Sequence, residues 1–372
     1  MKNHQFYLLS CLIYFCGQFT IQAQEIKTAN FSSDAWEIKA KKHEFVEYKG
    51  KQSLSITAGK ARLKNSTFKN GIIDYDIALH EGVNFSGVHF RVNGDNYEEF
   101  YLRSHQSGNP DATQYTPVIN GNSGWQLYHG KGHSSAYNFN FKEWMHIRLV
   151  IDDGKMDVFI NDMSQPFLHV PDLKLSPAAG QIGLSNGSGK AYFANLTYQA
   201  IEHPTLLSKT TSVPTPAKEV ISSWQVSSPF TDSLLKSVHQ LDEFPLYKNT
   251  NWQKLSTEYT GTINLSRITP VSRFNNTILV KAIIRSDKNQ LKRLDFGYSD
   301  VATLFVNKQA IYTGHNRFRS RDYRYLGTIG YFDGVFLPLK KGDNEIIFAV
   351  TENFGGWGMK AKLADLDGIV VQ

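Results

Sequence analysis

The sequence predicts an all-β protein with two β-sandwich (jelly-roll) domains in series after a signal peptide. Strand-like runs bounded by turn residues recur along the chain, and no long stretch has helical periodicity. A proline-rich stretch interrupts this rhythm in the middle part of the 372 residues. A chain of this length divides naturally into two domains, each large enough to bury a core.

The first residues have the pattern of a targeting segment. Lys2 supplies a positive charge, residues 6–15 are largely apolar, and Ala23 is a small residue at a suitable cleavage point. The apolar run is too short for a transmembrane helix. We therefore expect residues 1–23 to be a secretory signal peptide, with a buried N-terminal strand as the alternative. The protein would be exported, to the periplasm or out of the cell.

The cysteine count and the charge distribution limit the kinds of stabilisation and of partner to be expected. Cys11 and Cys16 are the two cysteines, and both lie in the expected signal peptide, so the exported chain would rely on its core rather than on disulfides. The formal charge of +6 is spread along the chain, whereas nucleic-acid binding favours a clustered basic stripe. No later segment is long and apolar enough to span a bilayer. We expect neither a nucleic-acid partner nor a transmembrane segment, and the oligomeric state stays open.

The expected first domain covers residues 24–201. Its strand candidates are short, rich in β-branched or aromatic residues, and bounded by turns. They are residues 51–57, 71–79, 87–92, 97–104, 144–151 and 155–161. The sequence Asp-Asp-Gly at 152–154 favours a hairpin turn between the last two of these strands.

Residues 202–220 form the expected linker, because three prolines lie there among small polar residues. The expected second domain covers residues 221–372. Its strand candidates are residues 277–285, 292–298, 302–307, 334–339, 345–351 and 359–364. Residues 234–241 could form one or two helical turns.

The most informative stretch for function is residues 97–133. Its first strand alternates large polar side chains with apolar ones, so one sheet face is polar. The preceding strand adds two more polar positions, and a tight turn near Gly94 would place both sets on the same face, where Arg91 and Glu99 could pair. Aromatic rings, a carboxylate, a guanidinium and an imidazole on one face suit a polar ligand, above all a sugar; a merely solvated face is the alternative.

The stretch after this strand is expected to complete the site. We expect residues 106–116 to form a loop over the rim and residues 125–129 to form a strand. Trp125 would stack on a sugar ring, unless it packs in the core, and Gln114 would bind hydroxyl groups. The candidate carbohydrate-binding residues are His89, Arg91, Glu99, Tyr101, Arg103, His105, Gln114, Tyr115 and Trp125.

No catalytic residues can be assigned from the sequence. Most glycosidases use a pair of carboxylates that flank the scissile bond. Glu98 and Glu99 are adjacent, so their side chains point to opposite faces of the strand. Asp74 and Asp76 share a strand face, but no Glu follows at the required spacing. The aspartate pair is therefore more typical of a solvated strand face. Tyr, His and Arg residues of the types that a lyase needs are present without a signature. Whether the protein is an enzyme therefore stays open.

Arginines crowd one loop of the second domain. Arg317, Arg319 and Arg321 are candidates for contact with an anionic glycan, since the guanidinium group suits carboxylates and sulfates. The alternative is local pairing with acidic neighbours. No cofactor is expected, and the histidines lack the spacing of a transition-metal site. A structural calcium ion remains an open alternative.

Several strings resemble known families. The W-x-x-I-R-L-x-I string at residues 144–151, the G-x-I-G-L string at 180–184 and the F-x-N-L-x-Y string at 193–198 resemble the concanavalin A-like lectin/glucanase (laminin-G-like) sandwich. Residues 299–307, 339–346 and 355–358 resemble the galactose-binding-domain-like jelly roll of exported bacterial glycan-utilisation proteins.

These resemblances imply a function class. We expect an exported carbohydrate-binding protein that recognises a poly- or oligosaccharide on the concave sheet of the first domain and is non-catalytic or accessory. One alternative is a glycoside hydrolase or polysaccharide lyase without a recognisable signature. The other is an interaction module with no sugar ligand, because this fold carries many functions.

Overall fold

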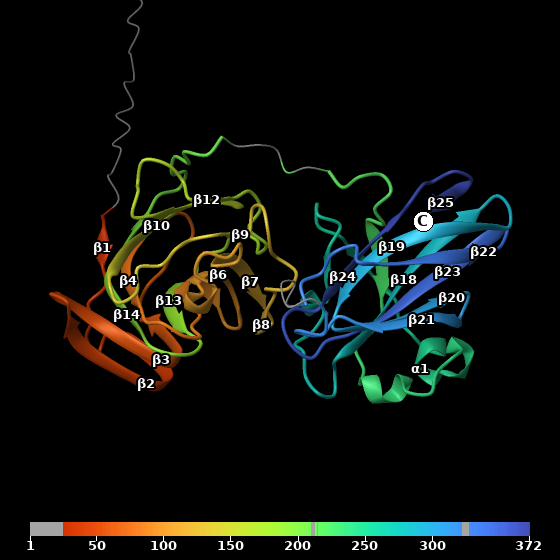
Figure 1. The fold of residues 1–372 in the computed structure, drawn as a ribbon, viewed down its shortest axis with the longest axis horizontal. Coiled ribbons are helices and arrows are strands. Elements are labelled where there is room, and N and C mark those ends of the chain that lie inside the picture. Colours follow the sequence, from red (N-terminus) through yellow and green to blue (C-terminus); the bar gives the residue numbers. More distant parts are fainter. Residues whose placement is uncertain (1–24, 210–212, 214, 322–326) are drawn as a thin grey trace, which may run out of the picture.

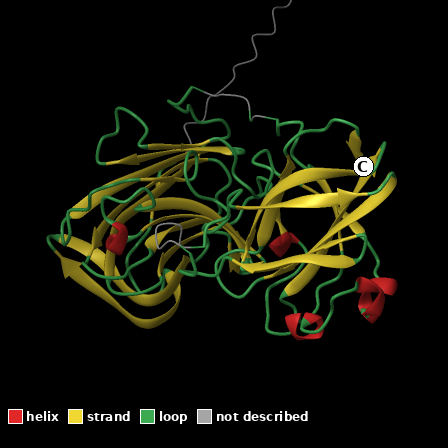
Figure 2. Ribbon diagram, turned by 45° about the vertical axis from the view of Figure 1, so that its right-hand side comes forward, coloured by secondary structure: helices red, strands yellow, loops and turns green. Residues whose placement is uncertain are grey.

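The computed structural model describes residues 25–209, 213, 215–321 and 327–372. The expected signal peptide and both cysteines lie outside the described residues. The described chain consists almost entirely of strands and loops, in two bodies that lie side by side (Figures 1 and 2). Among the described residues no helix is long and apolar enough to cross a membrane.

The first body is built from the strands of the N-terminal half. Their bounds are β1 (Lys27–Thr28), β2 (Trp36–Tyr48), β3 (Lys51–Leu63), β4 (Gly71–Leu79), β5 (Ser86–Asn93), β6 (Asn96–Leu102), β7 (Thr113–Ile119), β8 (Asn122–Ser123), β9 (Ser134–Ser135), β10 (Trp144–Asp152), β11 (Lys155–Ile160), β12 (Leu168–Val170), β13 (Gln181–Asn186) and β14 (Ala191–Ala200). They form one 14-stranded sheet in the order β12-β11-β10-β4-β14-β3-β13-β5-β6-β7-β8, with β1, β2 and β9 beside it.

This sheet curls over into a sandwich. Ile73 and Ile147 come from β4 and β10 near one end of the sheet, and Val88 and Phe100 come from β5 and β6 near the other end. All four belong to one buried cluster. The two ends of the sheet must therefore face each other across a common core, as in a two-layer sandwich. The predicted all-β fold is confirmed.

The structure corrects two sequence expectations next to the predicted site. Residues 106–116 are not one loop, because β7 begins at Thr113 and pairs with β6, where Gln114 lies opposite Tyr101. Residues 125–129 are not a strand. They form a turn in which the Leu127 and Tyr128 amides donate to Gly124 O, at 2.8 and 3.1 Å.

The second body contains two sheets. Its strands are β15 (Ser223–Val226), β16 (Gln253–Ser256), β17 (Ile263–Asn264), β18 (Thr277–Ser286), β19 (Gln290–Ser299), β20 (Val301–Val306), β21 (Gln309–His315), β22 (Asp333–Leu339), β23 (Gly342–Thr351), β24 (Gly358–Leu363) and β25 (Ile369–Val371). The larger sheet has the order β16-β15-β18-β23-β20-β21 with β25 beside β18, and the smaller has the order β17-β24-β19-β22. Phe296 of the smaller sheet and Phe348 of the larger share one core, so this body is also a sandwich.

Short helices cover part of the larger sheet. They are 3-10 turns at Asp232–Leu235 and Leu241–Glu243 and the helix α1 (Pro245–Lys248). Leu241 and Phe244 pack on Phe305 and Ile347 of the sheet. The helical turns expected over residues 234–241 therefore form at the two ends of that range.

A hydrogen-bonded seam joins the two sandwiches. The Tyr128 hydroxyl of the first donates to Glu258 Oε1 of the second at 2.6 Å. The Gln126 amide donates to Gly355 O at 3.0 Å, and the Ile329 amide donates to Gln126 O at 3.1 Å. Gly355 has φ +121°, and a Cβ atom there would collide with the buried Gln126 side chain. The backbone hydrogen bonds and this close contact fix two loops of the second sandwich over one face of the first.

Candidate functional site

A pocket of about 830 Å³ lies where those loops meet the first sandwich. Its floor is a sheet face to which β3, β13, β6 and β7 contribute lining residues, with β5 between β13 and β6; it is hereafter called the pocket face. Its walls are the loop before β5, the turn that carries Trp125, and two loops of the second sandwich. The lining includes Lys60, Phe85, Tyr97, Glu99, Tyr101, Arg103, His105, Trp125, Ser185, Phe318, Arg319 and Phe354. The volume is within the range of roughly 300–1,000 Å³ that is typical of small-molecule sites.

Glu99 is the central polar group of the pocket face. Alternation along β6 sends Phe100 into the core and Glu99 outward. His89 Nε2 lies 3.3 Å from Glu99 Oε1, and Ser185 Oγ lies 3.4 Å from the same oxygen. Burial lowers the pKa of His89, so its imidazole is neutral and can orient the carboxylate through a hydrogen bond. Both contacts are long, which leaves acceptor capacity on Glu99 for a ligand.

Lys60 and Tyr97 form the polar edge next to Glu99. The Lys60 ammonium donates to the Tyr97 hydroxyl at 2.5 Å, and the Tyr97 ring stacks on His89 with a centroid distance of 4.3 Å. Burial lowers the pKa of Lys60, although the Glu99 carboxylate opposes this effect. Tyr97 therefore offers its hydroxyl at a fixed place beside the carboxylate.

Arg103 connects the pocket face to the Trp125 turn. It donates to the Tyr101 hydroxyl at 2.8 Å and to Asp111 Oδ2 at 2.6 Å. Its guanidinium carbon lies 5.5 Å from the centroid of the Trp125 ring, a cation–π contact. Burial raises the pKa of Tyr101 to about 12, so the phenol is protonated at neutral pH.

Gln114 lies behind the pocket lining. Its Oε1 accepts from the Tyr101 hydroxyl at 2.7 Å, and its Nε2 donates to Trp125 O at 2.8 Å and also to Tyr128 O. Gln114 is 1 % exposed, so it does not reach a ligand directly. It instead fixes the positions of the Tyr101 phenol and the Trp125 turn.

Aromatic rings from both sandwiches make one wall of the pocket. Trp125 lies 6.1 Å from Phe318 and 5.8 Å from Phe354, and these two lie 6.0 Å apart, measured between ring centroids. Phe318 is 41 % exposed and Phe354 is 60 % exposed. On the other side Phe85, which is 36 % exposed, contacts His105 at 4.9 Å. These rings leave apolar area open to the pocket.

Two residues predicted for the site point elsewhere. Arg91 has φ +55° within a register shift between Phe90 and Asn93, which turns it off the pocket face. Its side chain donates to Lys69 O, Asn70 Oδ1 and Asp153 O, at 2.7, 2.8 and 2.7 Å. The expected pairing of Arg91 with Glu99 does not form.

Tyr115 is the second of these residues. It faces the core of the first sandwich and is fully buried there. Its hydroxyl donates to Glu98 Oε2 at 2.8 Å, and Glu98 is also buried, with its pKa raised to about 7 by burial. Both side chains belong to the core face because Tyr115 lies opposite Phe100 in the strand register.

The three arginines predicted to contact an anionic glycan lie in three different environments. Arg319 lines the pocket, with φ +61°. Arg321 donates to Asp333 Oδ2 at 2.5 Å, as in the alternative of local pairing. Arg317 is exposed and outside the pocket lining. The fourth arginine of this loop, Arg324, lies outside the described residues.

Sequence reasoning missed Lys60, Ser185, Phe85 and Phe354 as lining residues. Lys60 and Ser185 lie on β3 and β13, which pair directly with each other and share the pocket face. Their positions alternate with buried Ala61 and Leu184, a signal that could have marked them. Phe354 precedes a pair of glycines, and such a pair often marks close backbone approach.

Glu99 is the one carboxylate among the described residues that line the pocket. Glu98 points into the core, and Asp111 is held by Arg103. Glycosidase mechanisms with two carboxylates need a second acid on the other side of the scissile bond. The described lining therefore does not supply that arrangement.

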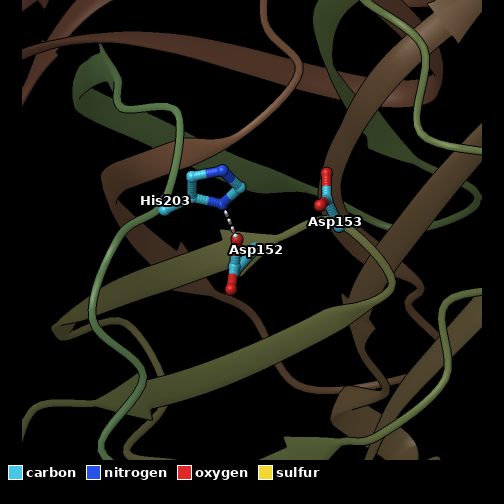
Figure 3. A group of neighbouring side chains, drawn as sticks. All are labelled: Asp152, Asp153 and His203. Atoms are coloured by element: carbon cyan, nitrogen blue, oxygen red, sulfur yellow. Dashed lines mark hydrogen bonds and ion pairs between the residues drawn. The ribbon is translucent and has the colours of Figure 1, made fainter.

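One group among the described residues could hold a metal ion (Figure 3). None of its residues lines the pocket. The ligand atoms of Asp152, Asp153 and His203 lie within 4.8 Å of one another. His203 is 3.3 Å from Asp152, whereas Asp153 accepts from Asn70 at 2.9 Å and lies 3.8 Å from Lys69. The Asp153 carboxylate is already engaged by these two neighbours, and we assign no metal to this group.

Comparisons with known proteins find similarity to the first sandwich. A family model for a 3-keto-alpha-glucoside-1,2-lyase-like domain matches residues 29–199, which is just under half of the chain. No curated protein sequence matches the chain.

Similar solved structures include a carbohydrate-binding module, CBM66, from Bacillus subtilis, with 12% identity, a TM-score of 0.36 and coverage of 45% of this chain and 96% of that one. They also include a Bacillus licheniformis β-glucanase with 12% identity, a TM-score of 0.34 and coverage of 49% and 100%. A laminarinase from Flavobacterium sp. UMI-01 has 9% identity, a TM-score of 0.34 and coverage of 46% and 95%.

These scores are too low to bear on function. The likeness of the second domain to galactose-binding jelly rolls stays a prediction. The family match and the strand arrangement confirm the resemblance of the first domain to the concanavalin A-like lectin/glucanase sandwich. Residues 29–199 thus form a β-sandwich that is similar to a 3-keto-alpha-glucoside-1,2-lyase-like domain.

Proposed function

We propose that this chain is an exported carbohydrate-binding protein that holds a poly- or oligosaccharide in the pocket between the two sandwiches, without cleaving it. The observation that carries the proposal is the pairing, in one pocket, of a carboxylate with open acceptor capacity and a wall of exposed aromatic rings. Export is part of the proposal and rests on the signal-peptide pattern of residues 1–23.

The lining matches the two kinds of surface that a sugar presents. The apolar C–H face of a pyranose packs against an aromatic ring, and its hydroxyl groups need fixed donors and acceptors. Trp125 supplies the ring, and the Arg103 guanidinium fixes its position from one side. Glu99, Ser185 and the Tyr97 hydroxyl supply hydrogen-bonding groups along the neighbouring sheet face.

A second candidate function is elimination from a 3-keto-glucoside. The name of the matching family favours it, and so does the state of His105, which lines the pocket. Burial and the nearby Arg103 charge lower the pKa of His105, so the imidazole is neutral at pH 7 and can accept a proton. Its Nδ1 lies 3.4 Å from the Asn84 amide, which leaves Nε2 for the substrate.

The reaction balances with groups in the pocket. A ketone at C3 acidifies the C2 proton, which His105 Nε2 would take. The electron pair forms the C1–C2 double bond, and the glycosidic oxygen leaves C1 with its bonding electrons and gains a proton. A guanidinium such as Arg103 or Arg319 would stabilise the charge that develops on the C3 oxygen.

The test is calorimetric titration of the full chain with a panel of oligo- and polysaccharides, followed by analysis for products. The proposal expects saturable binding to at least one glycan, at least tenfold weaker binding in Trp125→Ala, and no new products. Release of an unsaturated sugar from a 3-keto-glucoside, lost in His105→Gln, would favour the second candidate. Absence of binding across the panel would contradict both and leave an interaction module.

A further inference from the structure

The wall made by Trp125, Phe318 and Phe354 has a shape that a sugar alone does not require. Trp125 makes interplanar angles of 85° with Phe318 and 62° with Phe354, and the two phenylalanines make an angle of 74° with each other. A platform for a sugar chain would present ring faces that lie roughly in one plane. Three steeply inclined rings instead form a corner, which can enclose one planar apolar group by face and edge contacts.

The two phenylalanines are exposed, yet their backbones are fixed. Asp300 Oδ2 accepts from the amides of Asn353 and Phe354, at 2.9 and 3.0 Å. The Ser320 amide donates to Arg317 O at 2.9 Å, which closes the turn that carries Phe318. Gly355 follows Phe354 directly and is packed on Gln126 of the first sandwich. Exposed apolar rings on a fixed frame are typical of a binding surface.

Polar and apolar groups are separated within the pocket. Glu99, Ser185 and Lys60 lie on the sheet face, whereas the charged groups next to the corner are guanidinium groups. Arg103 lies 5.5 Å from the Trp125 ring centroid, and Arg319 lies 5.0 Å from that of Phe318. Guanidinium groups stack favourably on aromatic faces. The corner therefore favours an aromatic group, and the one carboxylate among the described lining residues, Glu99, lies on the sheet face instead.

We propose that this corner is a separate subsite for an aromatic aglycone, so that the ligand is an aryl glycoside whose sugar lies on the pocket face next to Trp125 and whose aryl group lies between Phe318 and Phe354, with Trp125 in contact with both parts of the ligand. The sugar half of this proposal rests on the proposed function. The aryl half rests on the corner alone, and the second sandwich supplies two of its three rings. Phe318 and Phe354 are thus specificity-determining residues.

The experiment measures the dissociation constants of the full chain for methyl α-glucoside, 4-nitrophenyl α-glucoside and free 4-methylumbelliferone. We expect the nitrophenyl glucoside to bind about tenfold or more tightly than the methyl glucoside, because the aryl group buries apolar area in the corner. The double variant F318A/F354A loses this preference, so that the two glucosides bind it with the same affinity. Glu99→Gln weakens both glucosides equally and keeps the preference.

Free 4-methylumbelliferone separates the two proposals. Saturable binding of this probe to the wild type, lost in F318A/F354A, supports the corner even where no glucoside binds. Absence of any aryl-dependent affinity in all three titrations overturns the aryl subsite, whatever the methyl glucoside does. An aryl preference that survives in F318A/F354A overturns it as well.

A conservative variant guards against a change in domain packing. Phe354→Leu keeps an apolar side chain on the same backbone and should leave the thermal unfolding midpoint unchanged. It should still reduce the aryl preference severalfold, since leucine removes the flat ring. An unchanged preference in Phe354→Leu would contradict a role for that ring.

Discussion

The first sandwich has two polar strand faces, and their comparison shows why one of them is a candidate site. On the outer face of β4 and β10, Asp74 lies 3.0 Å from His146 Nε2 and 2.8 Å from Arg148 Nε. Asp76 lies 2.8 Å from His146 Nδ1 and 2.7 Å from Lys51 Nζ. Each charge on this face is matched by a neighbour, and little binding capacity is left for a ligand.

The strands of the pocket face also alternate polar and apolar side chains, but their polar groups are less fully paired with one another. Among the described residues Glu99 has two polar contacts, both of them long, and it faces a cavity that the second sandwich covers with aromatic rings. An alternating polar strand therefore does not by itself indicate a site. What distinguishes a site is polar capacity that the fold leaves open, next to apolar area that the fold leaves exposed.

The largest expected effect is on the free energy of unfolding, and it arises in the loop that holds Phe354 over the pocket face. Glu352 is buried beneath this loop next to Asp300, and burial together with the Asp300 charge raises the pKa of Glu352 to about 8. The unfolded carboxyl ionises near 4.5, so the folded state retains a proton that the unfolded state loses. The free energy of unfolding therefore falls as the pH rises from 4.5 to 8.

The matched change is Glu352→Gln, which keeps the shape and removes the titration. We expect the wild type to lose about 3 kcal/mol between pH 5 and pH 8 through this group, and the variant to lose correspondingly less. Denaturant unfolding at several pH values measures the difference. Parallel pH profiles for the two proteins would show that Glu352 ionises normally in the folded state.

The next effect, on glycan affinity, compares Trp125, which lies in the pocket wall, with a tryptophan on the outer face. Trp125→Ala removes a ring from the pocket and should weaken glycan binding by roughly tenfold to a hundredfold, about 1–3 kcal/mol. Trp144 lies on the outer face, where Lys51 Nζ is 5.1 Å from its ring centroid. Trp144→Ala should lower stability but leave affinity unchanged. Equal losses of affinity in both variants would remove the distinction between the faces.

A smaller effect on stability is expected from the ion pairs of the outer face. Hydrogen bonds to Asp74 and Asp76 raise the pKa of His146 to about 9. A raised histidine pKa stabilises the fold fully below the unfolded value of 6.5, and this contribution is lost as the pH rises toward 9. The His146 side chain is 38 % exposed, so solvent screening limits the contribution to about 1 kcal/mol.

The variant His146→Gln tests this contribution. Thermal unfolding should show a stability loss between pH 6.5 and pH 9.5 in the wild type that is smaller in the variant, while glycan affinity at neutral pH is the same in both. A change in affinity would mean that the outer face is coupled to the pocket.

The smallest expected effect is a difference in glycan affinity between variants of two arginines in the same loop. Arg319 lines the pocket, and Arg319→Ala should weaken binding about threefold, as expected for one partly solvated cation. Arg317 is exposed outside the lining, so Arg317→Ala should have no effect. Calorimetry on the two variants measures this, and a larger effect of Arg317→Ala would contradict the placement of the loop.

Much of the fold could be predicted from local patterns. The strand expected at residues 71–79 has those bounds in the structure, and the alternation that places Glu99 and Tyr101 on one face is present in β6. These features depend on near neighbours along one strand, which the sequence displays directly. Arg91 was misplaced because a one-residue bulge reverses the facing of every side chain after it.

The pocket walls could not be predicted in this way. Phe318 and Phe354 meet Trp125 only because the two sandwiches dock, and docking depends on the shapes of both surfaces. Residues 125–129 carry aromatic residues typical of a strand, yet they form a turn whose hydrogen bonds go to Gly355 and Ile329. No pattern within residues 125–129 contains that information.

The most direct test of the account is a crystal structure of the full chain with the glycoside that binds most tightly in the titrations. We predict that a sugar hydroxyl lies within hydrogen-bond distance of the Glu99 carboxylate and that the ligand contacts Trp125 and Phe354. A ligand on the outer face of β4 and β10, or on the second sandwich away from Phe354, would contradict the account.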